Sequence, residues 1–121
     1  MLKIIDTNYA LRYLIQDDIE KAKVARDIIS EGAYILPESL VEIVYVLQKG
    51  YNVNRKEIGY ALLDLLLDVD IFDKVFYEDA IKIYRDNKLD YVDCLLLARH
   101  KLFNDKIFTF DVAVNKKCIK Y

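Results

Sequence analysis

Four acidic residues fall where short apolar runs of the sequence give way to helical patterns. Asp6 ends the apolar run 2–5, Glu42 lies in the first turns of a later expected helix, and Asp93 lies in the first turn of another. Asp111 directly follows an apolar run near the C-terminus. In a parallel α/β sheet, strand ends and helix starts share one edge, so these carboxylates are expected to converge there. Oxygen ligands without His or Cys suit Mg²⁺ or Mn²⁺.

Each acid also has a simpler structural explanation. Ser39 and Glu42 have the spacing of a capping box, as do Asp90 and Asp93, and Asp111 could be a turn residue. The helix dipole by itself favours an acid near a helix N-terminus by roughly 0.3–1 kcal/mol. Taken one at a time, the acids are therefore better explained as helix-end and turn residues.

Taken together, the four carboxylates need a counter-charge. Carboxylates that share a partly buried crevice repel each other, and each desolvated charge is costly unless it is paired. Arg12, Lys49 or Arg99 could reach the crevice. No Lys or Arg, however, stands in the stretches that hold the first three acids, which are 4–8, 39–43 and 90–94. Bound divalent cations are the alternative to these basic side chains.

Short apolar strands alternate with helices along the chain. Strands are expected at 2–5, 33–36, 106–110 and 118–121, with a weak edge strand at 69–72. Helices are expected between them, beginning near Thr7, Asp18, Pro37, Arg55, Asp73 and Tyr91. This alternation predicts an α/β fold of three layers, α/β/α, with a central, mainly parallel sheet of four to five strands. The whole chain, 1–121, is expected to be one domain.

Composition excludes several classes of protein. The chain has 121 residues, 18 Lys and Arg against 20 Asp and Glu, and a net charge of −2, so any contact with nucleic acid must come from a local patch. Cys94, Cys118 and His100 lack the spacing of a zinc site, and both cysteines are expected to be buried. No secretory signal and no apolar run of about 18 residues is present, so we expect a cytoplasmic protein without membrane attachment.

Four segments carry a resemblance to a known family: IIDTN, SLVEIVYVL, LDYVDCLLLARH and IFTFD. In this order they resemble the PIN-domain ribonucleases, in particular the VapC-type toxins of toxin–antitoxin pairs, over essentially the whole chain. The resemblance implies that Asp6, Glu42, Asp93 and Asp111 form an acidic quartet that holds one or two Mg²⁺ or Mn²⁺ ions. Thr109 matches a Ser or Thr that often accompanies the last acid.

Other residues are expected in supporting places. Thr7 stands beside the first acid, and Asp90 is expected to be a helix cap first and an outer ligand second. Arg12 and Lys49 could follow the phosphates of an RNA, and Tyr13 could stack on its bases. Tyrosine at helical spacing, however, is more often a core residue.

The resemblance also implies an activity and partners. The activity is metal-assisted hydrolysis of phosphodiester bonds in RNA, in which one ion lowers the pKa of a bound water and a second steadies the leaving oxygen. The implied partners are the RNA substrate, a second copy of the chain in a homodimer, and a small DNA-binding antitoxin that holds the toxin inactive.

Two other functions fit parts of the sequence. One is Mg²⁺-dependent phosphotransfer on an aspartate, as in receiver domains or haloacid-dehalogenase-like phosphatases, because Asp6 ends the first strand. The match is poor, since the phosphatase pattern needs a second Asp two residues on, where this chain has Asn8. The other is a non-catalytic module that keeps the fold and binds nucleic acid or protein. The complete set of four acids argues against it.

Overall fold

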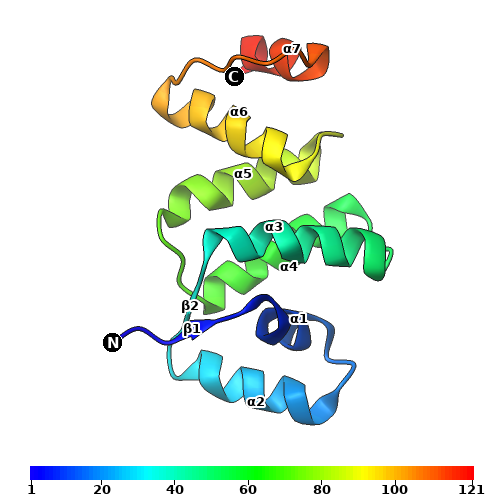
Figure 1. Cartoon of the computed structure of the whole chain (residues 1–121), viewed down its shortest axis with the longest axis vertical. Coiled ribbons are helices and arrows are strands. Elements are labelled where there is room, and N and C mark those ends of the chain that lie inside the picture. Colours follow the sequence, from blue (N-terminus) through cyan, green and yellow to red (C-terminus); the bar gives the residue numbers. More distant parts are fainter.

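The computed structural model describes all residues, 1–121, as an elongated stack of helices (Figure 1). Its elements are, in chain order, β1 (Ile4–Ile5), α1 (Thr7–Ile15), α2 (Ile19–Ser30), β2 (Tyr34–Ile35), α3 (Pro37–Tyr45), the π-helical turn η1 (Val46–Gly50), α4 (Arg55–Asp68), α5 (Lys74–Asp86), α6 (Tyr91–Phe103) and α7 (Val112–Lys120). None of the helices combines the length and the apolar composition that a membrane crossing needs.

The N-terminal half surrounds a small parallel sheet. β1 pairs with β2, with Ile4 opposite Tyr34 and Ile5 opposite Ile35. On the far side of β2, Asp70 adds a single parallel bridge, and its carbonyl accepts the N–H of Ile35 at 2.9 Å. In Figure 1, α2 lies below the strands, while α3 and α4 lie above them. Helices therefore cover the strands from both sides, which confirms an α/β arrangement in this half.

The sheet is smaller than the four to five strands expected from the sequence. The edge strand expected at 69–72 is reduced to the bridge at Asp70. Residues 106–110 form no regular secondary structure and bend at Phe110, and their main chain makes no hydrogen bond to the main chain of another segment. Phe108 and Phe110 are exposed, so no apolar contact of these rings holds the segment against a neighbouring strand. The prediction of a strand at 106–110 is therefore wrong for this arrangement of the chain.

The strand expected at 118–121 is also wrong, because the chain ends in the helix α7. Asp111 starts this helix, and its Oδ1 accepts two main-chain N–H groups of the first turn, at 2.8 and 3.1 Å. Val114, Cys118 and Tyr121 recur at helical spacing and pack against the core. This periodicity over the whole segment outweighs the β-propensity of its last few residues.

The other helices begin close to the expected residues because their caps are local. Asp6, Asp18 and Asn54 each accept a hydrogen bond from the N–H three residues on, at 2.8, 3.1 and 2.9 Å. Two expected caps do not act in this way. Asp73 has a left-handed backbone with φ 56°, and neither Asp73 nor Asp90 makes a side-chain cap bond.

The capping-box explanation for Glu42 does not hold in the structure. Pro37 is the first residue of α3, so Leu36 occupies the N-cap position. Ser39 lies buried inside the first turn and is not a cap. Glu42 therefore stands in the second turn with an exposed side chain, and helix capping does not account for it.

The core is built mainly from the apolar faces of the middle helices. Ile58, Leu62 and Leu65 of α4 are fully buried at helical spacing. α4 packs closely on α5, because a Cβ built on Gly59 would lie 2.7 Å from the Cβ of Arg85. Figure 1 shows that α5, α6 and α7 continue the stack away from the strands instead of adding to the sheet.

Candidate functional site

Three polar side chains beyond the end of β1 form what we call the N-terminal acidic group: Asp6, Thr7 and Glu42. Asp6 follows β1 directly and caps α1, so the strand and the helix together fix its position. The Thr7 hydroxyl donates to Glu42 Oε1 at 3.2 Å and so joins α1 to α3. All three residues line a cavity of about 580 Å³, together with the buried Ser39. Both carboxylates are exposed to solvent there.

Three more acids form what we call the C-terminal acidic group: Asp90, Asp93 and Asp111. Asp93 is half-buried in the first turn of α6, where burial raises the pKa of its carboxyl and the charges of Asp111 and Asp90 raise it further. The Thr109 hydroxyl accepts the N–H of Asp111 at 3.1 Å. Asn115 in turn donates to the Thr109 carbonyl at 3.0 Å. Negative charge thus accumulates where α6 and α7 begin.

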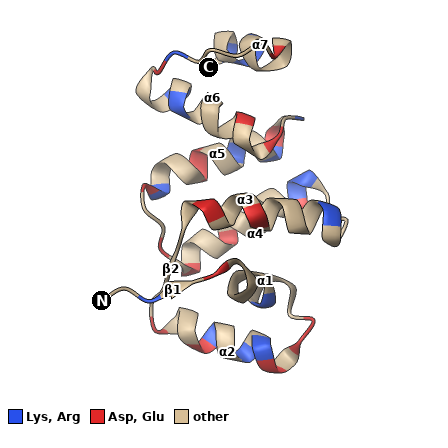
Figure 2. Ribbon diagram, in the orientation of Figure 1, with Lys and Arg blue, Asp and Glu red and all other residues tan.

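The two acidic groups are not brought together in this arrangement. The charges that raise the pKa of Asp93 come from its own group, and neither Asp6 nor Glu42 contributes. No three His, Cys, Asp or Glu side chains of the chain are grouped so that they could hold one metal ion. Figure 2 shows the reason: α7 lies at the far end of the stack from β1. The expected convergence needed a strand at 106–110 in the sheet, and that strand is not formed.

Neither group is neutralised by lysine or arginine. All ion pairs of the chain involve other acids. Arg12 pairs with Asp17 at 2.6 Å and Arg99 pairs with Asp105 at 2.6 Å. Lys49 lies one residue before the end of the π-helical turn and belongs to no ion pair. The basic side chains considered from the sequence therefore do not supply the counter-charge.

Two of the expected substrate-binding residues have other partners. The guanidinium of Arg12 is held by Asp17. The Tyr13 hydroxyl donates to Asp68 Oδ2 at 2.7 Å, and this hydrogen bond is the main reason that the pKa of Tyr13 is raised. Neither residue lines the cavity of the N-terminal acidic group. A role for them in binding RNA has no support from these contacts.

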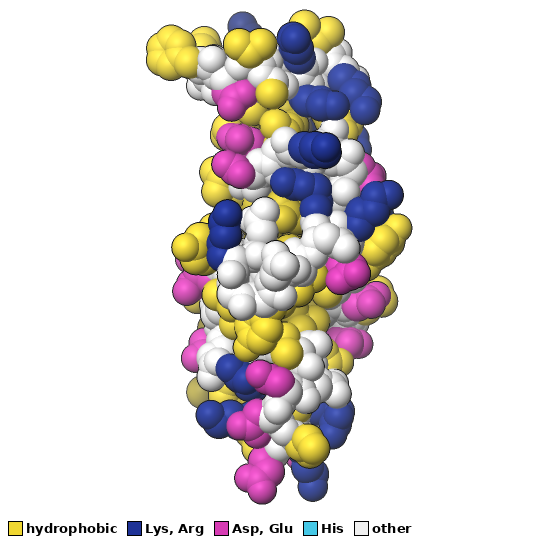
Figure 3. Space-filling model, turned by 90° about the vertical axis from the view of Figure 1, so that its right-hand side faces the viewer, with side chains coloured by type: hydrophobic (Ala, Val, Ile, Leu, Met, Phe, Trp, Pro, Cys, Tyr) yellow, Lys and Arg dark blue, Asp and Glu magenta, His cyan; other side chains and the backbone are white.

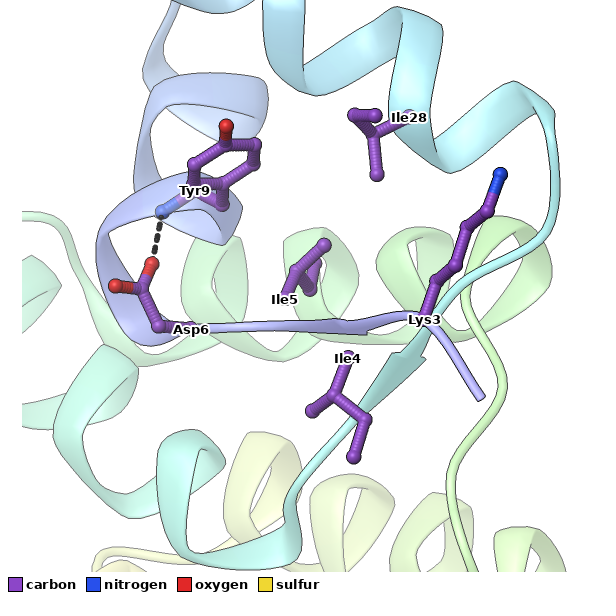
Figure 4. A pocket seen from close by; sticks show the side chains of 6 residues that line it. All are labelled: Lys3, Ile4, Ile5, Asp6, Tyr9 and Ile28. Atoms are coloured by element: carbon purple, nitrogen blue, oxygen red, sulfur yellow. Dashed lines mark hydrogen bonds between the residues drawn. The ribbon is translucent and has the colours of Figure 1, made fainter. Parts of the chain in front are cut away.

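A second cavity, of about 400 Å³, opens along the free edge of β1 (Figure 4). Lys3 and Ile5 project from the strand on the side that faces Tyr9 of α1 and Ile28 of α2, while Ile4 projects to the opposite side. Sequence reasoning did not single out Lys3, Ile4, Ile5 or Ile28 as site residues. The only signal was the alternation of sides along a strand, which puts Lys3 and Ile5 on one face.

Comparison with known families decides what kind of protein carries these groups. The PIN domain model matches residues 3–120. This chain belongs to the PIN-domain family. A VapC ribonuclease of Aquifex aeolicus (strain VF5) is 28% identical over 109 residues, with 83% of this chain and 79% of the relative covered. No solved structure is a significant match.

Membership of the family confirms the resemblance drawn from the four sequence segments. It also identifies this mostly helical α/β chain as a variant of the PIN fold. The residues after β1 matched an aspartyl phosphotransfer domain only poorly. Membership of the PIN-domain family therefore leaves no support for that function.

Proposed function

We propose that this PIN-domain protein is a divalent-metal-dependent endoribonuclease and the toxin of a toxin–antitoxin pair. The family and the VapC ribonuclease relative support a nuclease. The main observation behind the proposal is that four carboxylates form no ion pair with Lys or Arg. These four are Asp6, Glu42, Asp93 and Asp111. Unpaired carboxylates of this kind are the ligands that hard divalent cations prefer.

The donor chemistry of these residues suits Mg²⁺ or Mn²⁺, because every donor is an oxygen and no His or Cys joins them. Burial raises the pKa of the Asp93 carboxyl first, and the charges of Asp111 and Asp90 raise it further, as is expected where carboxylates gather. No three donors converge, however, so this arrangement by itself does not fit an ion and supports no metal-assisted step. We propose the four carboxylates as ligands of one or two ions on the strength of the family resemblance alone, with Thr7, Thr109 and Asp90 in supporting places.

Basic side chains on the C-terminal half support RNA as the substrate. Figure 3 shows lysine and arginine side chains gathered over the upper half of one face, where the C-terminal helices lie. α7 carries Lys116, Lys117 and Lys120 and no acidic residue. Such a patch attracts phosphates although the whole chain has a net charge of −2. An RNA that follows α7 passes beside the C-terminal acidic group.

An RNA cleavage assay tests the proposed activity. The purified protein is incubated with total RNA and Mg²⁺ or Mn²⁺, with and without a chelator, and the new RNA ends are mapped. We expect cleavage at discrete sites that the chelator abolishes. Asp6→Asn should remove the activity and keep the fold, since the Asn side-chain carbonyl can still accept the N–H of Tyr9 that now caps α1.

Asp64→Asn is the matched control for this assay, because Asp64 is an exposed acid of α4 that belongs to neither group. It should cleave like the wild type. Two results would contradict the proposal: RNA that stays intact with both metals, or full metal-dependent cleavage by Asp6→Asn.

The proposed role as a toxin has its own test in cells. Expression of the wild type in the cytoplasm of a bacterial host should stop growth, and expression of Asp6→Asn should not. Co-expression of the neighbouring reading frame should restore growth if that frame encodes the antitoxin. If the host keeps growing while the protein is folded and cleaves RNA, the role as a toxin is excluded and a role as an RNA-processing nuclease stands.

A non-catalytic PIN-fold binding module is the second candidate, and one observation favours it. The acids stand in two separate groups, neither of which is an ion site by itself. Calorimetric titration with Mn²⁺ separates the two candidates. The nuclease should bind Mn²⁺ and lose this binding in Asp93→Asn, whereas a binding module should show RNA or protein binding that is independent of the metal.

A further inference from the structure

His100 is the only histidine of the chain, and both of its ring nitrogens face main-chain carbonyl oxygens. Nδ1 lies 2.9 Å from the carbonyl oxygen of Asp105, and Nε2 lies 3.0 Å from the carbonyl oxygen of Cys118. Both distances are those of well-formed hydrogen bonds. A carbonyl oxygen can only accept, so each of these hydrogen bonds needs a proton on the ring nitrogen.

A neutral imidazole ring cannot make both hydrogen bonds. It has one N–H donor and one nitrogen with a lone pair, whereas the charged imidazolium ring has two N–H donors. In a neutral ring at this position, one nitrogen lone pair would point at a carbonyl oxygen within hydrogen-bond distance, and the two would repel each other. The contacts of His100 are therefore complete only when the ring is charged.

The two carbonyl groups have no main-chain donor of their own. Asp105 lies in the segment between α6 and α7, and no main-chain N–H donates to its carbonyl oxygen. Cys118 lies in the last turn of α7, where carbonyl groups lack a partner within the helix. Both residues are partly buried, and carbonyl groups withdrawn from water nearly always have a donor. His100 is the side chain that supplies a donor to each.

Two helix C-termini favour a positive charge on this ring. His100 itself stands in the last turn of α6, and its Nε2 contacts the last turn of α7 at Cys118. The negative end of a helix dipole stabilises a cation placed beside it. Because α6 and α7 pack on each other at one end of the stack (Figure 1), both helix ends act on the same ring.

The charged neighbours of His100 in α6 are already paired with acids. Arg99 pairs with Asp105 at 2.6 Å, and Lys101 pairs with Asp79 of α5 at 2.9 Å. Each pair has one positive and one negative member, so the two pairs add no net charge beside the ring. They therefore do not remove the preference for a charged imidazole.

The segment before α7 and α7 itself bring the other titratable groups. None of them makes a hydrogen bond with the ring, since its two nitrogens contact only main-chain oxygens. Most of the lysines among them are exposed, so water and salt screen their repulsion. The groups are the exposed Lys106, Lys116 and Lys120 and the partly buried Lys117, Cys118 and Tyr121.

We propose that His100 carries a proton on both ring nitrogens and so joins α7 to α6, and that the docking of α7 therefore depends on pH. A neutral ring keeps only one of its two hydrogen bonds. The bond to Asp105 closes a loop of 5 residues, whereas the bond to Cys118 spans 18 residues. The shorter loop costs less entropy to close, so the bond to α7 is the one that is lost.

Loss of this bond loosens α7 without releasing it. Val114 is fully buried in the core, and the side-chain amide of Asn87 donates to the Tyr121 hydroxyl at 3.3 Å. These contacts do not depend on His100. We therefore expect α7 to open more often when the ring is neutral, and to stay docked for most of the time.

The direction of the pH effect follows from the two states of the chain. A histidine in an unfolded chain loses its proton near about pH 6.5. The folded chain favours the protonated ring, so the stabilisation is complete below that pH and is lost as the pH rises and the folded ring gives up its proton. The docking of α7 is thus firmest in mildly acidic solution. This inference does not depend on the proposed nuclease activity.

NMR of the isotope-labelled protein tests the charge of the ring directly, because one histidine gives one set of imidazole signals. At about pH 7, where a histidine in an unfolded chain is mostly neutral, we expect both ring nitrogens of the folded protein to be protonated. Unfolding in urea at the same pH should return the ring to the mainly neutral form. A folded protein with only one protonated ring nitrogen at this pH overturns the proposal.

Amide hydrogen exchange measures the consequence for α7. The protein is compared at about pH 5.5 and about pH 8.5, on either side of the ordinary histidine titration, with the intrinsic pH dependence of exchange divided out. Opening of α7 should be about tenfold more frequent at the higher pH, because a hydrogen bond from a charged donor is lost. The amides of α4 should open equally at both. Equal opening of α7 at both pH values overturns the proposal.

Two variants assign the pH effect to His100. His100→Gln keeps a side-chain donor but cannot titrate, so the opening of α7 should no longer depend on pH. Lys116→Gln is the matched control, because Lys116 is an exposed residue of α7 without an ion pair, and it should keep the pH dependence of the wild type. An unchanged pH dependence in His100→Gln overturns the proposal. If His100→Gln does not fold, the NMR measurement on the wild type decides.

Discussion

Asp93 is the acid whose surroundings most oppose its charge, since burial and two neighbouring aspartates raise the pKa of its carboxyl. We expect Asp93→Asn to lose more than about 100-fold in RNA cleavage, because changes to mere supporting groups of a metal site already cost 10–100-fold. The free energy of unfolding should stay the same or rise, since desolvation and repulsion are removed. RNA cleavage and urea unfolding measure the two effects. An inactive variant that also unfolds more easily would assign Asp93 a structural role.

Tyr91 buries a hydroxyl group that has no hydrogen-bond partner. An unsatisfied buried hydroxyl costs roughly 1–3 kcal/mol. We therefore expect Tyr91→Phe to raise the free energy of unfolding by about 1 kcal/mol at pH 7, with part of the gain lost to imperfect repacking. Urea unfolding checks this, with Tyr60→Phe at an exposed site as the control. A destabilised Tyr91→Phe would mean that the hydroxyl has a partner in solution.

The same residue predicts how stability depends on alkaline pH. Burial raises the pKa of Tyr91 above its ordinary value of 10.0. Ionisation of Tyr91 leaves the free energy of unfolding unchanged below pH 10 and lowers it as the pH rises above 10, because the unfolded chain ionises this group first. The free energy of unfolding should therefore fall above pH 10, and less steeply in Tyr91→Phe. Equal slopes in both proteins would exclude Tyr91 as the cause.

At the scale of elements, the contact between α4 and α5 depends on a glycine. A Cβ at position 59 would lie 2.7 Å from the Cβ of Arg85, whereas a Cβ at position 50 would lie 3.6 Å from Val46 Cγ1, an ordinary contact. Alanine gains about 1 kcal/mol of helix propensity, but overpacking costs up to about 3 kcal/mol. Gly59→Ala should thus destabilise the protein and Gly50→Ala should not. Thermal unfolding of both variants decides; a stabilised Gly59→Ala would show that the two helices can separate.

Helices and strands differ in how far the sequence predicted them. Asn54 and Asp18 cap helices as expected, because a cap and the 3.6-residue periodicity involve only neighbours in the chain. The segments 106–110 and 118–121 were expected as strands and are not. A strand exists only with a partner far away in sequence, and no local pattern guarantees that partner.

At the scale of the whole molecule, the two cysteines report on unfolding. Cys94 is fully buried between packed helices, and burial raises the pKa of its thiol to about 12. Cys118 is partly exposed. We expect a thiol reagent to label Cys118 in the native protein and to label Cys94 only as fast as the molecule opens. Mass spectrometry of the labelled peptides measures both rates. Equal labelling of both would show that the C-terminal helices open readily.

The sequence by itself indicated the family, all the helices except α7 and the acids proposed as ligands, because motifs, caps and helical periodicity are properties of short segments. It also indicated that no arginine or lysine neighbours most of these acids, and the ion pairs of the structure agree. Only the tertiary structure decided that Asp6 shares a cavity with Glu42, while Asp93 and Asp111 stand at the other end of the stack. The physical reason is that a parallel sheet gathers distant acids only where its strands pair, and the edge of β1 has no partner within one chain.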